Sequence, residues 1–462
     1  MAVAKRENDL GRDPVGKLLL RLALPSVTAQ LVNALYNIVD RIYIGHIEGV
    51  GDLALTGLGV CFPVLMFVSA ISALVGMGGG SRAVVRMGEG KEEQANAILG
   101  GCFTLLVVLS LVVTIVFQLV KQPMLLLFGA TQETIGYAVD YLSIYLWGTI
   151  AVELSLGLNF FITAQGFSTI GMATVLIGAV INIILDPIFI FAFGMGVQGA
   201  ALATITAQIV SAIWVVRFLS GNRTKLRLQK RFFRLNFKVL APVLALGISP
   251  FIMQSTESLV NIAFNSSLKA YGGTPAVGAM TICSSIMQVF YLLFQGLSQG
   301  AQPIIGFNYG AGNLDRVKKT FRLLITCALI FSCSACAAIE LFPGVFVAMF
   351  NDKPELVSIA VWSLRIYVAG MFMLGIQNAC QQTFVALGQA KVSLFLALLR
   401  KVILLIPLIF ILPLLFQDKV MAVFLSEPAA DILAAITTGS IFLWRFPRIL
   451  ARRKEELEHK HA

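Results

Sequence analysis

Two aspartate residues, Asp40 and Asp186, lie inside long apolar stretches of the first half of the chain. A carboxyl group is costly to bury in lipid, so an intramembrane aspartate is a functional candidate by default. Because a low-dielectric surrounding disfavours the charged form, such a group can take up and release a proton. The competing interpretation is a carboxyl that only forms hydrogen bonds between helices. We find these two intramembrane acids in the first half, and proton exchange is the chemistry they predict.

Three polar residues precede Asp40 in the same apolar stretch. Asn33 and Asn37 are four residues apart, and so are Tyr36 and Asp40, so each pair shares one side of a helix. We expect Asn33, Tyr36 and Asn37 to contact a bound solute beside the acid.

The second acid has an amide partner and a proline next to it. Asn182 precedes Asp186 by four residues and therefore faces the same way. Pro187 cannot donate a hydrogen bond to the carbonyl of Ile183, so a bend with a free carbonyl is expected there. Pro187 is accordingly a candidate hinge.

The second half of the chain carries a different set of polar residues. The counterpart of Asp40 is Asn265, and those of Asn182 and Asp186 are Val402 and Ile406, so the acid cluster is absent. Glu257, Asn261 and Asn265 are instead spaced by four residues and form one stripe. Glu257 either binds a cationic solute or is a structural, helix-paired acid. Glu427 and Asp431 also share a face, for which a structural role is favoured.

Amides and methionines of the second half are of the kind that lines an adaptable binding cavity, and we expect Asn261 and Met287 to contact solute. A methionine in an apolar helix is more often simple packing. No phosphate-binding loop is present, because Gly76–Gly80 has the wrong spacing. The three histidines lie near the ends of apolar stretches or in the tail, so we expect no metal centre. We also expect that the chain uses no cofactor and is not an enzyme.

The elements that hold these residues follow from composition. Of 462 residues, 58% are apolar and 13% are charged, against roughly 25% charged in a soluble domain. A chain of this composition predicts an all-α polytopic membrane protein rather than a soluble one. The net charge of +11 raises the question of nucleic acid, but the basic residues occupy short connections between apolar stretches, which indicates contact with the lipid bilayer and no nucleic-acid partner.

Windows of about 19 residues give twelve predicted spans. They cover residues 17–41, 53–77, 94–120, 137–160, 170–193, 197–219, 239–268, 276–300, 320–343, 356–384, 391–416 and 422–446. All but six of the 35 Lys and Arg residues fall on one side of this arrangement. By the preference of basic residues for cytoplasmic loops, both termini are expected in the cytoplasm.

The halves resemble each other at a shift of 222 residues, which aligns Gly88 with Gly310, Tyr145 with Tyr367, and Gly148 with Gly370. Six spans are an even number, so duplicated halves enter the membrane in the same sense and form a parallel repeat. The expected organisation is an N-terminus at 1–16, a first lobe of six helices at 17–220, a basic linker at 221–238, a second lobe at 239–448 and a tail at 449–462.

The chain resembles the multidrug and toxic compound extrusion (MATE) family, in particular the bacterial damage-inducible and staphylococcal-type efflux proteins. The resemblance covers roughly residues 15 to 448 and is carried by Pro25–Asp40, Gly88–Gly90, Asn182–Pro187, Tyr271–Gly273, Gln302–Ala311 and Asp315–Lys319. It implies a V-shaped pair of lobes that exports organic cations and amphipathic drugs in exchange for protons or sodium ions.

The resemblance also implies that Asp40, Asn182, Asp186 and Thr204 form the coupling site, and that the first span bends at Pro25. Sodium between Asp40 and Asp186 is the alternative to protons. We expect a monomeric antiporter in a bacterial cytoplasmic membrane that works by alternating access. The rival functions are a lipid-linked saccharide flippase of the same superfamily and a channel or non-transporting receptor.

Overall fold

The computed structural model describes residues 8–350 and 354–461, with side chains to His459. The described part is built of helices and loops without strands, which confirms the predicted fold class. The first bundle, here called the N-lobe, contains α1 (Val15–Gly45), α2 (Gly51–Gly88), α3 (Glu92–Leu127), α4 (Ile135–Trp147), α5 (Thr149–Ala164), α6 (Ser168–Pro187) with the π-helical turn η1 (Ile188–Ala192), and α7 (Gly196–Ser220).

A connection with the 3-10 turn η2 (Lys230–Phe232) leads to the second bundle, the C-lobe. It contains α8 (Phe237–Ala311), α9 (Leu314–Leu341), α10 (Pro343–Ala348), α11 (Pro354–Val368), α12 (Met371–Ala386), α13 (Ala390–Leu398) with the π-helical turn η3 (Leu399–Leu405), α14 (Ile406–Leu415) and α15 (Lys419–His461). The tail expected at 449–462 is, as far as it is described, a helical extension of the last span. The expected N-terminus at 1–16 is described only from Asn8.

Within the described residues, nine helices are long and apolar enough to cross a membrane, and two bent pairs raise the number to eleven. The pairs are α4 with α5, bent by 59°, and α11 with α12, bent by 44°. The twelfth span comes from α8. Its 75 residues would extend about 110 Å if straight, several times the thickness of a bilayer.

Helix α8 is in fact two spans joined at Gly273, whose φ of 66° is a backbone conformation that favours glycine. Both ends of α8 contact the same short stretch of α2, because Gly247 lies against Leu74 and Gly310 against Val85. A straight α8 could not bring residues so far apart to one place. It therefore folds back on itself, as the predicted spans 239–268 and 276–300 require.

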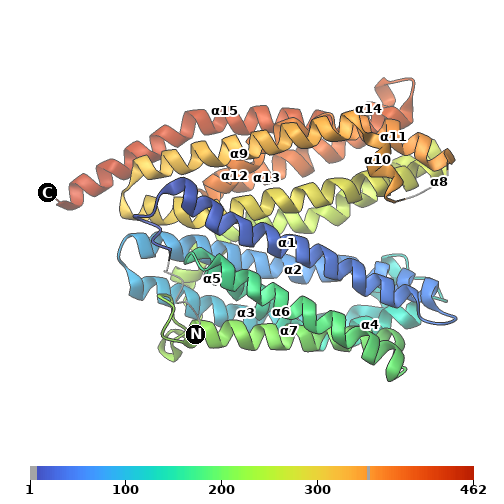
Figure 1. Cartoon of the computed structure of the whole chain (residues 1–462), viewed down its shortest axis with the longest axis horizontal. Helices are drawn as coiled ribbons and strands as arrows, with labels where there is room; N and C mark the ends of the chain where they lie inside the picture. The colour runs from blue at the N-terminus through green and yellow to red at the C-terminus, as the bar shows by residue number, and fades with distance from the viewer. Residues whose placement is uncertain (1–7, 351–353, 462) are drawn as a thin grey trace.

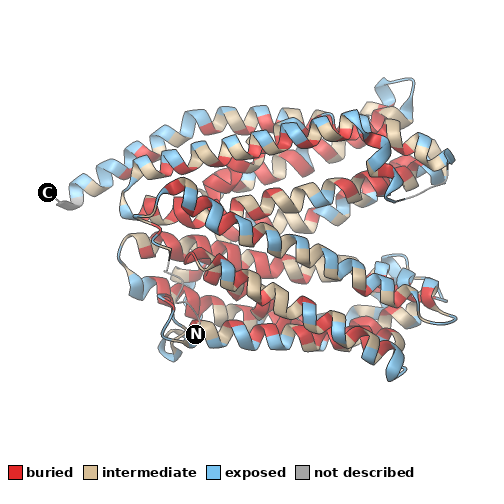
Figure 2. Ribbon diagram, viewed as in Figure 1, coloured by how far each residue is buried: buried red, intermediate tan, exposed pale blue. Residues whose placement is uncertain are grey.

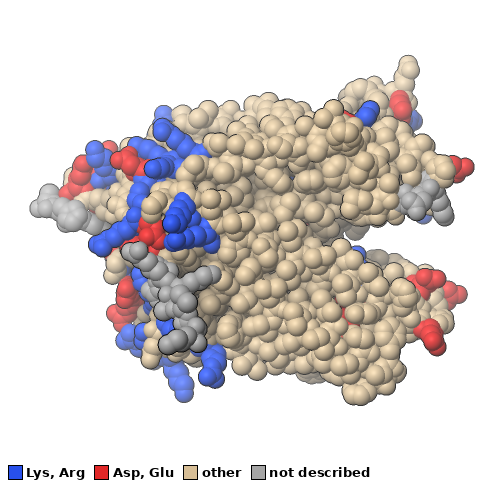
Figure 3. Space-filling model, in the orientation of Figure 1, with Lys and Arg blue, Asp and Glu red and all other residues tan. Residues whose placement is uncertain are grey.

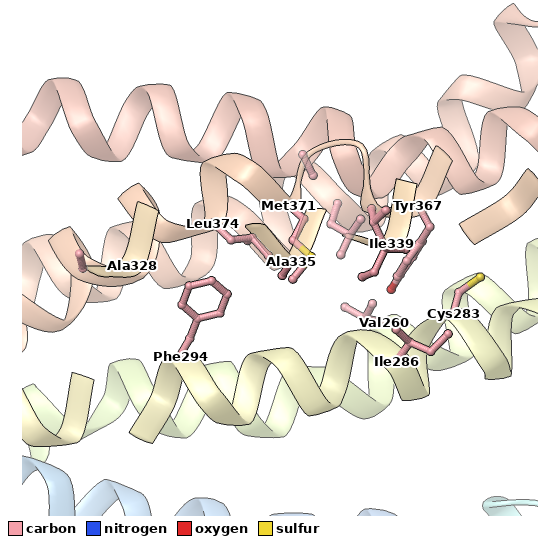
Figure 4. Packing of buried hydrophobic residues seen from close by; sticks show 14 of the residues in the cluster. Val260, Cys283, Ile286, Phe294, Ala328, Ala335, Ile339, Tyr367, Met371 and Leu374 are labelled. Carbon is pink, nitrogen blue, oxygen red and sulfur yellow. The ribbon is translucent and has the colours of Figure 1, made fainter. Parts of the chain in front are cut away.

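The two lobes lie side by side with their helices roughly aligned (Figure 1). Each has an apolar interior, in which buried residues line the facing sides of the helices (Figure 2). In the C-lobe, Phe294, Tyr367 and Met371 belong to this core (Figure 4). Lys and Arg gather at one end of the molecule, here called the basic end, and a cleft between the lobes opens at the opposite end (Figure 3). The molecule thus has the V shape that the resemblance implies.

The lobes meet through α2 and α8 near the basic end. A Cβ atom at Gly88 would collide with the carbonyl oxygen of Phe307, and one at Gly310 would collide with that of Val85. These glycines occupy matched positions in the repeat and also contact each other across the joint. Contact between matched positions is what a two-fold axis between duplicated halves produces, so the internal repeat is built into the joint.

An arginine of α15 connects the lobes at the basic end. Arg453 is buried, donates hydrogen bonds to the carbonyls of Tyr309 and Gly310 at 3.2 and 2.8 Å, and pairs with Glu89 of the N-lobe at 2.9 Å. Glu89 lies just after α2 and also binds Arg86 at 2.6 Å. The basic end is therefore held shut by an ion pair as well as by packing.

Candidate functional site

The two aspartates predicted to exchange protons meet inside the N-lobe, where α1 packs against α6. Asp40 is 8% exposed and Asp186 is fully buried. Their carboxyl groups are close enough to share a hydrogen bond when one of them is protonated. Arg41, the next residue, is exposed, and its guanidinium lies 5.6 Å from the ring centre of Phe62. The acid pair thus has no ion-pair partner in the described part of the chain.

An amide and a hydroxyl group complete this cluster. The Asn182 amide donates to Asp186 Oδ1 at 3.1 Å and lies 3.4 Å from the Thr204 hydroxyl of α7. One oxygen each of Asp40, Asp186 and Asn182 is buried without a hydrogen-bond partner among the described residues. Of these three atoms, the two carboxyl oxygens can receive a proton, and all three can be ligands of a small cation. The four residues assigned to coupling are therefore brought together.

A small cavity that is partly open to solvent adjoins this cluster. Asn182 and Thr204 form one part of its wall, and Asn33 and Tyr36 of α1 form another. Tyr36 lies within electrostatic range of both aspartates. Ser155 of α5 donates a 2.5 Å hydrogen bond to Gln208 of α7, and both line the cavity as well. The arrangement is a polar chamber with a neutral lining and an acidic edge.

Asn37 is placed apart from this chamber. Its side chain is exposed and donates to the carbonyl of Asn33 at 2.7 Å, so it faces out of the lobe. Of the three polar residues proposed to contact solute on α1, the structure brings Asn33 and Tyr36 together and leaves Asn37 outside.

Of the two hinge candidates, Pro25 lies within a helix and Pro187 lies at the end of one. Pro25 is inside α1, between Ala23 and Val27, where α1 crosses Gly296 and Gly300 of α8 at the joint of the lobes. Pro187 ends α6 and is followed directly by η1, a π-helical turn. A π-helical turn marks a break in the regular hydrogen-bond ladder, as expected next to a proline that cannot donate.

Glu257 of the C-lobe has a basic partner. Its carboxylate accepts a hydrogen bond from Lys401, which also donates to the carbonyl of Met253 at 3.3 Å. Glu257 is half-exposed and Lys401 is buried. Asn261 is half-buried one turn further along α8, and Met287 packs against the C-lobe core. The structure therefore leaves Glu257 and Asn261 as neighbours on one stripe of α8, with Glu257 paired to a lysine, and places Met287 against the C-lobe core.

A second ion-pair cluster lies deeper in the C-lobe. Arg400 donates to Asp431 at 2.7 Å and to Glu427 at 3.2 Å, and all three side chains are buried. Each acid of the C-lobe interior is thus held by a basic side chain. This arrangement matches the structural role favoured for Glu427 and Asp431.

The expectation of two intramembrane acids in the first half is wrong. Glu153 of α5 is a third, and it is fully buried with neither carboxyl oxygen hydrogen-bonded among the described residues. It lies inside the predicted span 137–160, so a count of every acid within the spans would have found it. The spacing of polar residues did not reveal it, because the residues four positions away are Thr149 and Gly157, which do not suggest a motif.

Comparison with known proteins places the chain in a family. The chain is 26% identical over 402 residues to the multidrug export protein MepA of Staphylococcus haemolyticus, covering 87% of each chain. A crystal structure of MATE in complex with MaD3S has a TM-score of 0.88 at 25% identity and covers 96% of this chain and 98% of the other.

An outward-facing multidrug resistance MATE family transporter of the MOP superfamily has a TM-score of 0.88 at 24% identity, covering 97% of this chain and 100% of the other. This last likeness concerns the fold alone. The MatE family description matches residues 25–188 and again 250–411, one segment in each lobe. The two matched segments make up most of the sequence, and the chain belongs to the MatE family.

Proposed function

We propose that the chain is a secondary active exporter that moves organic cations and amphipathic drugs out of the cell in exchange for protons. The observation that carries this proposal is the buried Asp40–Asp186 pair beside a polar chamber, with no basic partner among the described residues. The relative named as a multidrug export protein supports the same substrate class. The basic end faces the cytoplasm of a bacterial cell by the preference of Lys and Arg, so both termini are cytoplasmic and the cleft opens outward.

The cycle follows from the charge of the aspartate pair. In the form with the cleft open, a proton from outside binds to the pair and removes the negative charge that holds a cationic solute. The solute leaves, the lobes rock about their joint, and α1 bends at Pro25. At the basic end the proton escapes to the cytoplasm, and the ionised pair binds the next cation.

The energetics set how many protons are needed. Export against a hundredfold gradient costs about 2.7 kcal/mol. Moving one unit charge through 100 mV is worth about 2.3 kcal/mol. One proton exchanged for one monovalent cation cancels the voltage contribution, so only the pH gradient then drives export. A second proton, or a sodium ion carried in addition to the first proton, restores the voltage as a driving force.

The proposal is tested in proteoliposomes with an imposed pH gradient and a fluorescent organic cation. We expect Asp40→Asn and Asp186→Asn to abolish gradient-driven accumulation. The matched control is Asp52→Asn, because Asp52 is exposed in the first turn of α2. If both variants at the pair transport like the wild type, the assignment of coupling to these residues is wrong. Replacing the pH gradient with a sodium gradient separates the two ions.

The flippase alternative is less consistent with the C-lobe. A flippase for anionic lipid-linked saccharides needs free positive charge facing a central cavity. Arg400 and Lys401, the deep basic residues of the C-lobe, are instead paired with Asp431, Glu427 and Glu257. Dye efflux from cells with and without an uncoupler distinguishes an exporter from a flippase, a channel or a receptor.

A further inference from the structure

Glu153 has no role in the cycle described above, although it is a fully buried acid in the same lobe. Both of its carboxyl oxygens lack a hydrogen-bond partner among the described residues, and so does the hydroxyl of Thr149, one turn earlier. Residues four apart lie on the same face of a helix. Three buried oxygen atoms without partners therefore lie together on α5.

These atoms lie where the fourth span is broken. The helices α4 and α5 meet at Gly148 at an angle of 59°, and Thr149 is the first residue of α5. Broken helices in membrane transporters expose unpaired backbone groups that take part in binding coupling ions. The bent pair runs from Ile135 to Ala164, so Glu153 lies well away from either end of this span.

Glu153 is separate from the aspartate site. Ser155, two residues later, faces the polar chamber and binds Gln208 of α7. Two residues correspond to a rotation of about 200° around a helix, so Glu153 faces away from that chamber. Tyr145 of α4 lies within electrostatic range of Glu153. No charged group of α2, α3, α6 or α7 among the described residues forms a hydrogen bond with the Glu153 carboxyl.

An ionised carboxylate in this position would be a bare charge in the membrane interior, which is strongly unfavourable. Glu153 must therefore carry a proton in the form with the cleft open. It can ionise only if the α4–α5 break rearranges and admits water. The charge state of Glu153 is thus tied to the conformation of the lobe.

The matched break in the C-lobe also lies beside a buried acid, but that acid is on another helix, and the shift of 222 residues pairs Glu153 itself with Gly375. The shift of 222 residues places Gly370 opposite Gly148, and Gly370 lies at the break between α11 and α12. Gly370 packs directly on Pro428 and Asp431 of α15. The carboxylate of Asp431 is held at 2.7 Å by Arg400, a permanent cation. Among the described residues, no basic side chain forms a hydrogen bond with Glu153, so a bound proton is what neutralises its charge.

We propose that Glu153 is a second proton-binding group of the N-lobe, located at the α4–α5 break and exchanged once in each transport cycle. The proton enters from the outside, forms the O–H bond of the carboxyl, and passes to water at the basic end when that bond breaks. This inference rests on the proposed proton-coupled export. Two protons for one monovalent cation give the cycle a net charge, so a voltage alone drives export.

The test uses proteoliposomes with a potassium diffusion potential, no pH gradient, and the monovalent dye ethidium. At 100 mV, one net charge per cycle allows wild-type protein to accumulate the dye up to about fiftyfold. We expect Glu153→Gln to lose this voltage-driven accumulation and to keep accumulation driven by a pH gradient. The matched control Glu133→Gln, at an exposed position, should behave as the wild type.

The outcomes separate the two proposals. Voltage-driven accumulation that persists in Glu153→Gln overturns the second proton site. A wild-type protein that responds to the pH gradient but not to voltage also overturns it and leaves the proposed function intact. A wild-type protein that responds to neither gradient overturns the proposed function itself.

A second measurement does not depend on transport, and the Glu153→Asp variant supports it if the glutamine variant fails to fold. Infrared spectroscopy of purified wild-type protein at neutral pH should show the carbonyl absorption of a protonated carboxyl. We expect one component of this band to shift in Glu153→Asp and to be lost in Glu153→Gln, while the component that belongs to the Asp40–Asp186 pair remains. If neither variant changes the band, Glu153 is ionised and the inference is wrong.

Discussion

The N-lobe and the C-lobe share one architecture but treat buried acids in opposite ways. In the N-lobe, Asp40, Asp186 and Glu153 have no basic partner in the described part of the chain. In the C-lobe, Asp431 and Glu427 are bound by Arg400, and Glu257 by Lys401.

A carboxylate next to a guanidinium stays ionised, whereas an isolated buried carboxyl is neutral and can exchange its proton only when its surroundings change. Under the proposed function, one of the two similar bundles keeps fixed charges and the other exchanges protons. Four predictions test this difference between the paired acids of the C-lobe and the unpaired acids of the N-lobe, starting with the largest effect on stability.

Removing the guanidinium of the C-lobe should have the largest effect. Arg400→Met leaves Asp431 and Glu427 buried without a partner, and breaking a buried pair in this way costs about 3–5 kcal/mol. Thermal unfolding in detergent should show a large drop in Tm. The control is Arg365→Met, because Arg365 is exposed. Adding Asp431→Asn to Arg400→Met should restore part of the loss. An unchanged Tm in the single variant would show that the C-lobe pairs are not structural.

The ion pair between the lobes should contribute less. Arg453→Gln removes the contact with Glu89 and two hydrogen bonds to backbone carbonyls, at an expected cost of about 2–3 kcal/mol. Because these contacts join the lobes at the basic end, we also expect a cysteine label placed there to react faster with a water-soluble reagent. The neighbouring Arg452→Gln, exposed on α15, is the control. Equal labelling rates would show that packing alone holds this end shut.

The ion pair between Arg453 and Glu89 predicts that the stability of the protein depends on pH. Burial opposes ionisation of Glu89, but hydrogen bonds from Arg86 and Lys91 and the charges of Arg86 and Arg453 outweigh it and lower the pKa of Glu89 to about 2. A lowered pKa in the folded state gives stability that is present at pH above the ordinary value of 4.5 and is lost as the pH falls toward 2.

The Tm difference between wild-type protein and Glu89→Gln should therefore be constant from pH 7 to about pH 5 and shrink below that. Glu92→Gln, exposed in the first turn of α3, should show a smaller and less pH-dependent difference. A difference that grows on acidification would contradict the assigned pairing.

The smallest effect on stability is expected for Asp186→Asn in the N-lobe. Asp186→Asn keeps an acceptor for the Asn182 amide and removes no basic partner, so unfolding should change by less than about 1 kcal/mol. Transport driven by a pH gradient should nevertheless be lost. A destabilisation as large as that of Arg400→Met would place Asp186 among the structural acids instead.

Much of the fold followed from local properties of the chain. Apolar windows predicted all twelve spans, including the two that are joined in α8, because burial in lipid demands long uninterrupted apolar helices. The spacing of four residues predicted that Asn182 and Asp186 face the same way, and they form a hydrogen bond at 3.1 Å. Such pairs depend only on helix geometry, which is the same in every helix.

Contacts between distant residues could not be obtained in this way. The meeting of Asp40 with Asp186, and the pairing of Glu257 with Lys401 across 144 residues, depend on how helices pack against one another. The sequence by itself determined the spans, and with them which acids could enter the membrane, Glu153 included. Only the tertiary structure decided which of them meet a positive charge, because a side chain's partner is chosen by neighbouring helices and not by its own.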